Sequence, residues 1–398
     1  MSGKKLLSKN RHKTRPHRRG KTPRNAHRVL APTDPLLASH VTPPSAQAIV
    51  VPAPAPKPAV EVVPPEPIKR PVMEHRKFEP PTPEPSDDED DLDLKVVVKE
   101  SPEPVAESED VPQTAVDPPG TCGAMFSAKG RRYYQEDRGV VDDATGFYAV
   151  FDGHGGDKAS RFCAKHMAEY VGAEMAKAGG AATASDEAVA GAFVAAFIAL
   201  DKKFQDKLVD DGSTACVAQV VRTAAGLRLH VANAGDSRCI VVCADGTAVA
   251  MSVDQKPHDP VERARIEAAN HEVELIDELV DGKRIKLSRV DGILAVARAI
   301  GDHSLKDYGV PPEKTAVTCV PVVQHLAVDP AVHRFVVLAS DGVWDVFSNN
   351  DAAQLVRSRL PDGAAPTAAA LEQAAQALVQ GAIDRNSADN CTAVVVAL

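Results

Sequence analysis

The sequence predicts an α+β sandwich over residues 119–398. Short segments rich in Val and Ala, bounded by Gly, Asp or Asn, cluster in the middle of this region. Segments of helical composition come in pairs on either side of them. This grouping favours a sandwich over alternating β-α-β units, in which strands and helices would follow one another in turn.

The N-terminal segment has a different composition. Residues 1–120 hold 23 of the 31 prolines and a single aromatic residue, Phe78. Such a segment cannot bury enough apolar surface to offset the loss of chain entropy on folding. We therefore expect residues 1–118 to form a disordered, Pro-rich tail and residues 119–398 to form one large domain.

The tail contains two charged blocks. Residues 1–28 hold eleven Lys and Arg and no acidic residue, and "SDDEDDLD" follows at 86–93. The simplest interpretation of each block is a solvated part of the tail. The sharper hypotheses are nuclear import or nucleic-acid contact for the basic block, and phosphorylation or docking at Ser86 for the acidic one. The tail itself is neutral, so the domain carries the whole net charge of −9 and opposes phosphate-backbone binding. Nucleic acid could then be contacted only through residues 1–28.

The cysteine content and hydropathy indicate an intracellular protein. The seven cysteines are dispersed, and the chain has no CxxC motif and no run of 18 apolar residues. This pattern is typical of reduced core thiols and makes a cysteine-ligated zinc site improbable. We expect a cytoplasmic and/or nuclear protein without a membrane span, and a monomer by default.

Seven segments have the composition and boundaries of β-strands. They lie at 147–152, 214–222, 227–235, 238–246, 246–254, 334–341 and 391–398. Residues 226–252 contain three of these segments in close succession and predict a meander, whose last two strands are joined by an Asp-Gly turn.

Four segments predict helices, at 157–178, 185–209, 348–360 and 368–385. The second opens with Ser185 and Glu187 in a setting that resembles a helix cap. Two of these helices precede most of the strands and two lie near the C-terminus, which gives the pairing on which the fold class depends.

Acidic residues stand where strand-like segments begin or end. These are Asp152 in "YAVFD", Asp341 in "VVLASD", Asp236 in "NAGDSR", Asp389 in "ADNCTAVVV", and the pair Glu136 and Asp137 in "RRYYQED". One such carboxylate is usually a turn or cap residue. Five such sites without clustered Cys or His predict an oxygen-rich pocket, which suits Mg²⁺ or Mn²⁺ and, less often, Ca²⁺.

Three neighbouring residues fit the hydrolysis of phosphate esters. Gly153 would let its carbonyl turn toward a metal, Arg132 could hold phosphate oxygens bidentately, and His154 could protonate a leaving alkoxide. Two ions that share a carboxylate could generate hydroxide near neutral pH. Taken alone, however, His154 is more simply a hydrogen-bonded turn residue and Arg132 a surface charge.

The domain resembles the metal-dependent Ser/Thr protein phosphatases of the type 2C family from about Cys122 to Leu398. Eight motifs in family order carry the resemblance: "RRYYQED", "YAVFDGHGG", "DGSTACVA", "VANAGDSR", "DQKPHDPVERARI", "GILAVARAIGD", "LASDGVWDVF" and "ADNCTAVVV". It implies a four-layer α-β-β-α sandwich of two antiparallel sheets flanked by helix pairs, with the metals at one end.

The resemblance also implies a role for each site residue. Asp152 would bridge two Mn²⁺ or Mg²⁺ ions, with Asp341 and Asp389 on the first and Glu136 and the Gly153 carbonyl on the second. The remaining roles are a water-holding carboxylate at Asp137, a phosphate-binding arginine at Arg132, a general acid at His154, and a weaker third metal site at Asp236 with Asp341.

The implied activity is metal-dependent hydrolysis of phosphoserine and phosphothreonine in phosphoprotein substrates by a bridging hydroxide. A pseudophosphatase scaffold is the alternative, but it would be expected to lack metal carboxylates that this chain keeps. One departure from the family lies at Asn270 and His271, where a Gly-Gly turn is usual, before a slightly long segment that resembles the family's flap. It bears on substrate preference rather than on chemistry.

Overall fold

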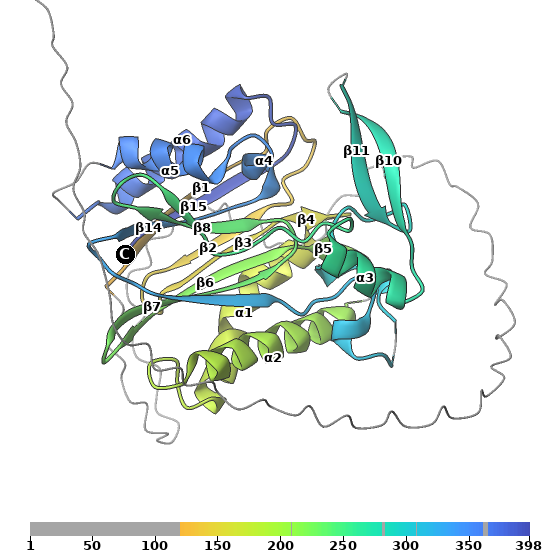
Figure 1. The fold of residues 1–398 in the computed structure, drawn as a ribbon, viewed down its shortest axis with the longest axis horizontal. Helices are drawn as coiled ribbons and strands as arrows, with labels where there is room; N and C mark the ends of the chain where they lie inside the picture. Colours follow the sequence, from red (N-terminus) through yellow and green to blue (C-terminus); the bar gives the residue numbers. More distant parts are fainter. Residues whose placement is uncertain (1–119, 208, 281–282, 308, 361–364) are drawn as a thin grey trace, which may run out of the picture. The chain divides into compact units, whose positions relative to one another are not determined.

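Two antiparallel β-sheets form the centre of the part of the chain that the computed structural model describes. This part comprises residues 120–398 except 208, 281–282, 308 and 361–364. The tail expected over residues 1–118 lies outside the described residues. Helices cover the outer face of each sheet (Figure 1), so the predicted α-β-β-α sandwich is confirmed.

The first sheet has five antiparallel strands. In spatial order they are β1 (Cys122–Ala128), β15 (Cys391–Ala397), β14 (His333–Ala339), β8 (Arg238–Cys243) and β9 (Ala248–Ala250). Helices α5 (Asn349–Arg359) and α6 (Ala368–Asp384) pack on its outer face, and the short helix α4 (Asp341–Trp344) follows β14 directly.

The second sheet also has five antiparallel strands. In spatial order they are β13 (Val322–Ala327), β7 (Gly226–Ala234), β6 (Ala215–Thr223), β3 (Phe147–Phe151) and β2 (Arg138–Asp142). Its outer face is covered by α1 (Lys158–Lys177) and α2 (Asp186–Gln205). The Ser185 side chain caps α2 by accepting from Ala188 N at 3.3 Å, as the sequence predicts.

Apolar side chains fill three layers, one between the sheets and one under each helix pair. Strand β3 contributes to two of them. Phe147 and Phe151 point to the helices, whereas Tyr148 and Val150 point to the other sheet. A strand buried on both faces needs apolar residues at every position, which explains why "FYAVF" does not alternate.

The meander predicted over residues 226–252 is wrong in its first connection. Strands β8 and β9 do form a hairpin, in which Cys243 N donates to Thr247 O at 2.8 Å. Strand β7, however, pairs with β6 and β13, while β8 pairs with β14 in the other sheet. The chain crosses between sheets at Gly235, whose φ is +114°. Because buried strands of both sheets have the same apolar pattern, local sequence could not assign β7 and β8 to different sheets.

Smaller elements extend one end of the sandwich. Strands β4 (Gly153–His154), β5 (Gly212–Ser213) and β12 (Ile300–Gly301) form a short sheet. A hairpin of β10 (Val273–Val280) and β11 (Lys283–Val290) lies beyond α3 (Pro260–Ala268), and the 3₁₀ turns η1 (His303–Leu305) and η2 (Pro312–Lys314) follow. None of the helices in the described ranges has the length and apolar character that a bilayer span requires.

A buried ion cluster ties α2 to the segment after β12. Asp201 Oδ1 accepts from Lys306 Nζ at 2.6 Å and from Gly301 N at 2.8 Å, and it lies 3.4 Å from His303 Nε2. Burial alone raises the pKa of the Asp201 carboxyl, but Lys306 and His303 lower it from 3.8 to about 2. A carboxylate with a depressed pKa stabilises the fold above its unfolded pKa, and this stabilisation is lost as the pH falls through the folded pKa.

We therefore expect Asp201→Asn to remove an acid-sensitive contribution to stability. The free energy of unfolding of the wild type should exceed that of the variant at roughly pH 6. This difference should shrink by about 1 kcal/mol at roughly pH 3 and by about 2 kcal/mol near pH 2. Urea unfolding at a series of pH values measures this difference. Asp206→Asn, at the exposed end of the same helix, is the control. A pH-independent difference between Asp201→Asn and the wild type would contradict the assignment.

Candidate active site

A cavity of about 250 Å³ lies where strands of both sheets end. Asp152 follows β3, Asp341 follows β14, and Asp389 precedes β15. Eight of the nine predicted site residues line this cavity: Arg132, Glu136, Asp152, Gly153, His154, Asp236, Asp341 and Asp389. The ninth, Asp137, lies behind its wall. Residues more than 250 positions apart in the sequence thus meet at one site.

Three carboxylates form the closest group in the cavity. Asp152, Asp236 and Asp341 each place an oxygen within 4.8 Å of the other two. Asp236 is buried and also forms an ion pair with Lys256, which no sequence pattern indicated. The packing of three acidic side chains at this spacing is unfavourable unless positive charge balances it.

The pKa values of these acids reflect the crowding. Burial, followed by the charge of Asp137, raises the pKa of Asp152 well above its usual range. Burial and the charge of Asp236 do the same to Asp341. Burial also raises the pKa of Glu136, although the nearby Arg132 guanidinium opposes the shift. The cavity therefore favours any ligand that neutralises carboxylates.

Asp137 occupies a buried position next to this group. It is 2% exposed, and its Oδ2 accepts from the Ser340 hydroxyl at 2.7 Å. Its Oδ1 has no hydrogen-bond partner among the described residues. Burial raises the pKa of Asp137 to about 6. A buried carboxylate oxygen without a partner points to a missing donor, such as a water molecule held by a cation.

Gly153 is fixed by close packing rather than by an unusual φ. A Cβ at this position would lie 2.7 Å from Glu136 O and 2.8 Å from Ser160 Oγ. A side chain here would therefore push apart the two segments that carry Glu136 and Asp152. The glycine lets β4 run against the Glu136 backbone, and Gly153 lines the cavity.

Arg132 lies at the mouth of the cavity, where its side chain is 53% exposed. Its Nη2 donates to Asp389 Oδ2 at 2.6 Å. Asn390 fixes the loop that carries Arg132, because its Nδ2 donates to Lys129 O at 2.8 Å and to Tyr134 O at 2.9 Å. An exposed guanidinium held by one carboxylate keeps most of its five donors available for an anion.

His154 has a partner that no local sequence pattern indicated. Its Nε2 lies 2.9 Å and 2.8 Å from the two carboxylate oxygens of Asp302. Burial by itself lowers the pKa of His154, but Asp302 outweighs it, and the net pKa lies above the usual range. Asp302 belongs to the motif "ARAIGD", yet 148 residues separate it from His154, and only the pairing of β4, β5 and β12 brings them together.

The segment that departs from the family pattern forms the β10–β11 hairpin beside the cavity. Asn270 adopts a φ of +61° after the end of α3, a conformation that Asn tolerates better than most residues other than Gly. His271 Nδ1 contacts Asp291 Oδ2 at 2.6 Å. Asn270 and His271 therefore form a turn at the point where the sequence lacks a Gly-Gly pair. Arg289, in β11, also lines the cavity and was not predicted from the sequence.

The donor set of the cavity fits a hard divalent cation. It offers carboxylate oxygens, and its three closest acids need positive charge. Oxygen-only sites of this kind suit Mg²⁺ and Mn²⁺. The free Cys residues lie elsewhere, and the described ones other than Cys122 are buried.

Comparisons with known proteins identify the family of the chain. A family model described as "Protein phosphatase 2C" matches residues 128–391. The chain is similar to "Protein phosphatase 2C homolog 2" of Schizosaccharomyces pombe, with 38% identity over 214 residues that cover 54% of this chain and 52% of the relative. It is also similar to "Probable protein phosphatase 2C 59" of Oryza sativa subsp. japonica, with 36% identity over 276 residues that cover 68% of this chain and 73% of the relative. The chain spans about half the length of the first of these relatives.

A solved structure has the same fold. The crystal structure of a phosphatase from a pathogenic strain of Toxoplasma gondii aligns with a TM-score of 0.59 and 26% sequence identity. The alignment covers 71% of this chain and 94% of that chain.

Proposed function

The chain belongs to the protein phosphatase 2C family, and on this basis we propose that it removes phosphate from phosphoserine and phosphothreonine residues of proteins with the help of Mg²⁺ or Mn²⁺. The observation that carries the proposal is the convergence of carboxylates, Arg132 and His154 on one cavity. The pseudophosphatase alternative predicts the loss of one or more of these groups, and all of them are present.

The chain's own residues divide into two sets of metal ligands. Asp152 would serve both ions, with Asp341 and Asp389 completing the first set and Glu136 and the Gly153 carbonyl the second. Asp236 would hold a weaker third ion with Asp341. When bound, the ions would neutralise the acids, polarise the phosphoryl oxygens and lower the pKa of a water molecule so that it becomes the nucleophile.

Arg132 would orient the substrate. Its guanidinium is exposed at the cavity mouth, and its planar fork matches two oxygens of a phosphate monoester. The ion pair with Asp389 uses Nη2, so the other donors of the guanidinium would be available to the phosphate oxygens.

His154 would protonate the departing serine or threonine oxygen. An alkoxide is a poor leaving group, so a positioned acid with a raised pKa helps its release near neutral pH. Asp302 holds the ring by Nε2 and stabilises the imidazolium. We assign Asp302 as a positioning residue, since it acts through His154 rather than on the substrate.

The effect of replacing Asp302 on kcat should depend on the leaving group of the substrate. Asp302→Asn is expected to lower kcat for a phosphothreonine peptide by about 10- to 100-fold, because the acid loses its orientation. It should change kcat for p-nitrophenyl phosphate much less, because p-nitrophenolate leaves without a proton. Parallel steady-state assays with both substrates measure the contrast. Asp307→Asn, at a partly exposed position in the same segment, is the control. Equal losses on both substrates would indicate a purely structural role.

Phosphate release from a phosphothreonine peptide tests the proposed function directly. The full chain should be active with Mn²⁺ or Mg²⁺ and inactive with EDTA, and calorimetry should detect binding of the same ions. Folded protein that binds neither ion and releases no phosphate would overturn the proposal and favour the scaffold alternative.

A further inference from the structure

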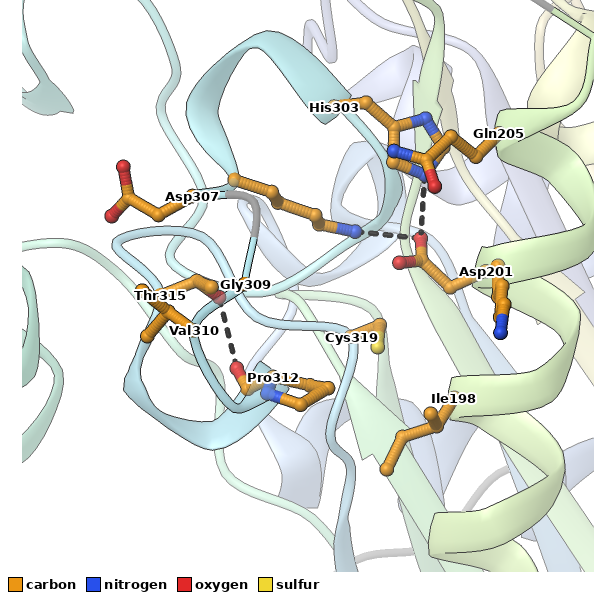
Figure 2. A pocket seen from close by; sticks show the side chains of 12 residues that line it. Ile198, Asp201, Gln205, His303, Asp307, Gly309, Val310, Pro312, Thr315 and Cys319 are labelled. Carbon is orange, nitrogen blue, oxygen red and sulfur yellow. Dashed lines mark hydrogen bonds and ion pairs between the residues drawn. The ribbon is translucent and has the colours of Figure 1, made fainter.

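A second cavity, of about 360 Å³, lies between α2 and lining residues from segments 303–307 and 309–319 (Figure 2). It shares no lining residue with the catalytic cavity. Its volume falls within the range of pockets that bind small molecules. Nothing in the proposed phosphatase chemistry uses it, so its walls are free to serve another ligand.

The walls of this cavity are largely apolar. Ile198 contributes one wall from α2, and Val310 and Pro312 lie across from it (Figure 2). Cys319 lines the inner end, and burial followed by the charge of Asp201 raises the pKa of its thiol to about 12. The thiol therefore stays protonated and acts as a small apolar surface rather than as a nucleophile. Facing apolar walls of this kind suit a flat ring.

The polar lining residues are Lys202, Gln205, Asp307 and Thr315, together with three members of the buried ion cluster, Asp201, His303 and Lys306. Contacts from Gly301, Lys306 and His303 all reach Oδ1 of Asp201. Figure 2 shows the other carboxylate oxygen of Asp201 turned toward the cavity. Lys306 Nζ donates to Asp201 at 2.6 Å and to Ala299 O at 2.9 Å, which uses two of its three N–H groups in the part of the chain that the structure describes. The ion pair thus presents an acceptor and a donor side by side.

The charges along the lining balance. The carboxylates of Asp201 and Asp307 are offset by the ammonium groups of Lys202 and Lys306. An anionic ligand would meet the two carboxylates, and a cationic ligand would meet the two ammonium groups. A neutral group that donates one hydrogen bond and accepts another leaves this balance intact and pairs with both halves of the buried ion pair. An amide or lactam edge has this pattern.

We propose that this cavity binds a neutral primary amide or lactam carried on a flat apolar ring. The N–H of the amide would donate to Asp201, its carbonyl would accept from Lys306, and the ring would lie between Ile198 and Val310. A series of contacts connects this site with His154 of the catalytic cavity. Asp201 also holds Gly301 N, and the next residue, Asp302, holds His154.

Benzamide, benzoate and benzylammonium form a matched series of probes for this site. The three share one ring and differ in charge, so their relative affinity tests the argument from charge balance. Methyl NMR of the full chain, labelled at Ile and Val, would follow the Ile198 and Val310 signals during each titration in EDTA. We expect saturable shifts with benzamide at a Kd of about 1 mM, at least about ten-fold tighter than with either ion. Because metal is absent, the result does not depend on phosphatase activity.

Two variants that fill the cavity test the location. Ile198→Trp and Val310→Trp should each abolish binding of benzamide, and Val310 is 39% exposed, so a larger side chain there does not disturb the core. Val261→Trp, at a position on α3 that is 76% exposed, is the control and should bind normally. The proposal is overturned if benzamide fails to bind, if the three probes bind equally, or if a folded Trp variant retains binding.

Discussion

Replacing Asp152 by Asn should lower kcat for a phosphothreonine peptide by about 10³-fold or more while it makes the metal-free protein more stable. Asp152 stands in the tightest group of acids and would serve both metal ions. An uncharged amide cannot hold two divalent cations, so the nucleophilic water and much of the charge stabilisation would be lost. Steady-state assays with Mn²⁺ measure the loss of activity.

The predicted gain in stability has its cause in the same carboxylates. Burial and the neighbouring acids raise the pKa of Asp152 and of Asp341, which means that the folded state disfavours their charges. Removing one charge reduces the electrostatic repulsion among the remaining carboxylates. In EDTA, the Tm of Asp152→Asn should therefore lie above that of the wild type. In Mn²⁺ the order should reverse, because ions at about 100 times their Kd stabilise only the wild type, by about 2.7 kcal/mol per site.

Asp329→Asn is the control for both measurements. Asp329 stands in an exposed turn before β14 and does not line the cavity. This variant should keep the activity, the Tm in EDTA and the rise of Tm with Mn²⁺ of the wild type. If Asp152→Asn lowers the Tm in EDTA, repulsion among the cavity carboxylates does not destabilise the metal-free fold, and the predicted origin of the stability gain is wrong.

Replacing Glu262 by Ala should cost about 3–5 kcal/mol of stability. Glu262 is 4% exposed and accepts from Arg265 Nη2 at 2.6 Å and from Arg298 Nη2 at 2.6 Å. Both guanidiniums also bind backbone carbonyls, including Ala297 O at 2.8 Å and Val320 O at 2.9 Å. Without Glu262, two largely buried cations would remain with no carboxylate between them. The loss would loosen α3 from the segment 297–320, which follows the β10–β11 hairpin.

Urea unfolding followed by the fluorescence of Trp344 measures this cost. Trp344 is the single tryptophan of the chain and is 4% exposed, so its emission reports loss of the core. The matched control is Glu267→Ala on the same helix, whose ion pair with Arg263 is about half exposed and should contribute less than about 0.5 kcal/mol. If both variants lose the same stability, the buried cluster does not have the role assigned to it.

The sequence by itself determined the fold class and most of the site. The strands at 147–152 and 391–398 and the helices α1, α2, α5 and α6 were predicted because their apolar content, caps and turn residues are local properties. The predicted carboxylates were found at strand ends because an acid after a buried strand is a local signal as well. Eight of nine predicted residues line one cavity for that reason.

The tertiary structure decided which strands are neighbours and which side chains meet. Strands β7 and β8 share one apolar pattern but belong to different sheets, since strand pairing depends on partners far away in the chain. Asp302 and Glu262 each act through contacts that link distant segments, at separations of 148 and 36 residues. A side chain's partner is set by packing, whereas its sequence neighbours report only local conformation. For the same physical reason, no sequence pattern indicated the cavity beside α2, which exists only because α2 and the segment after β12 pack against each other.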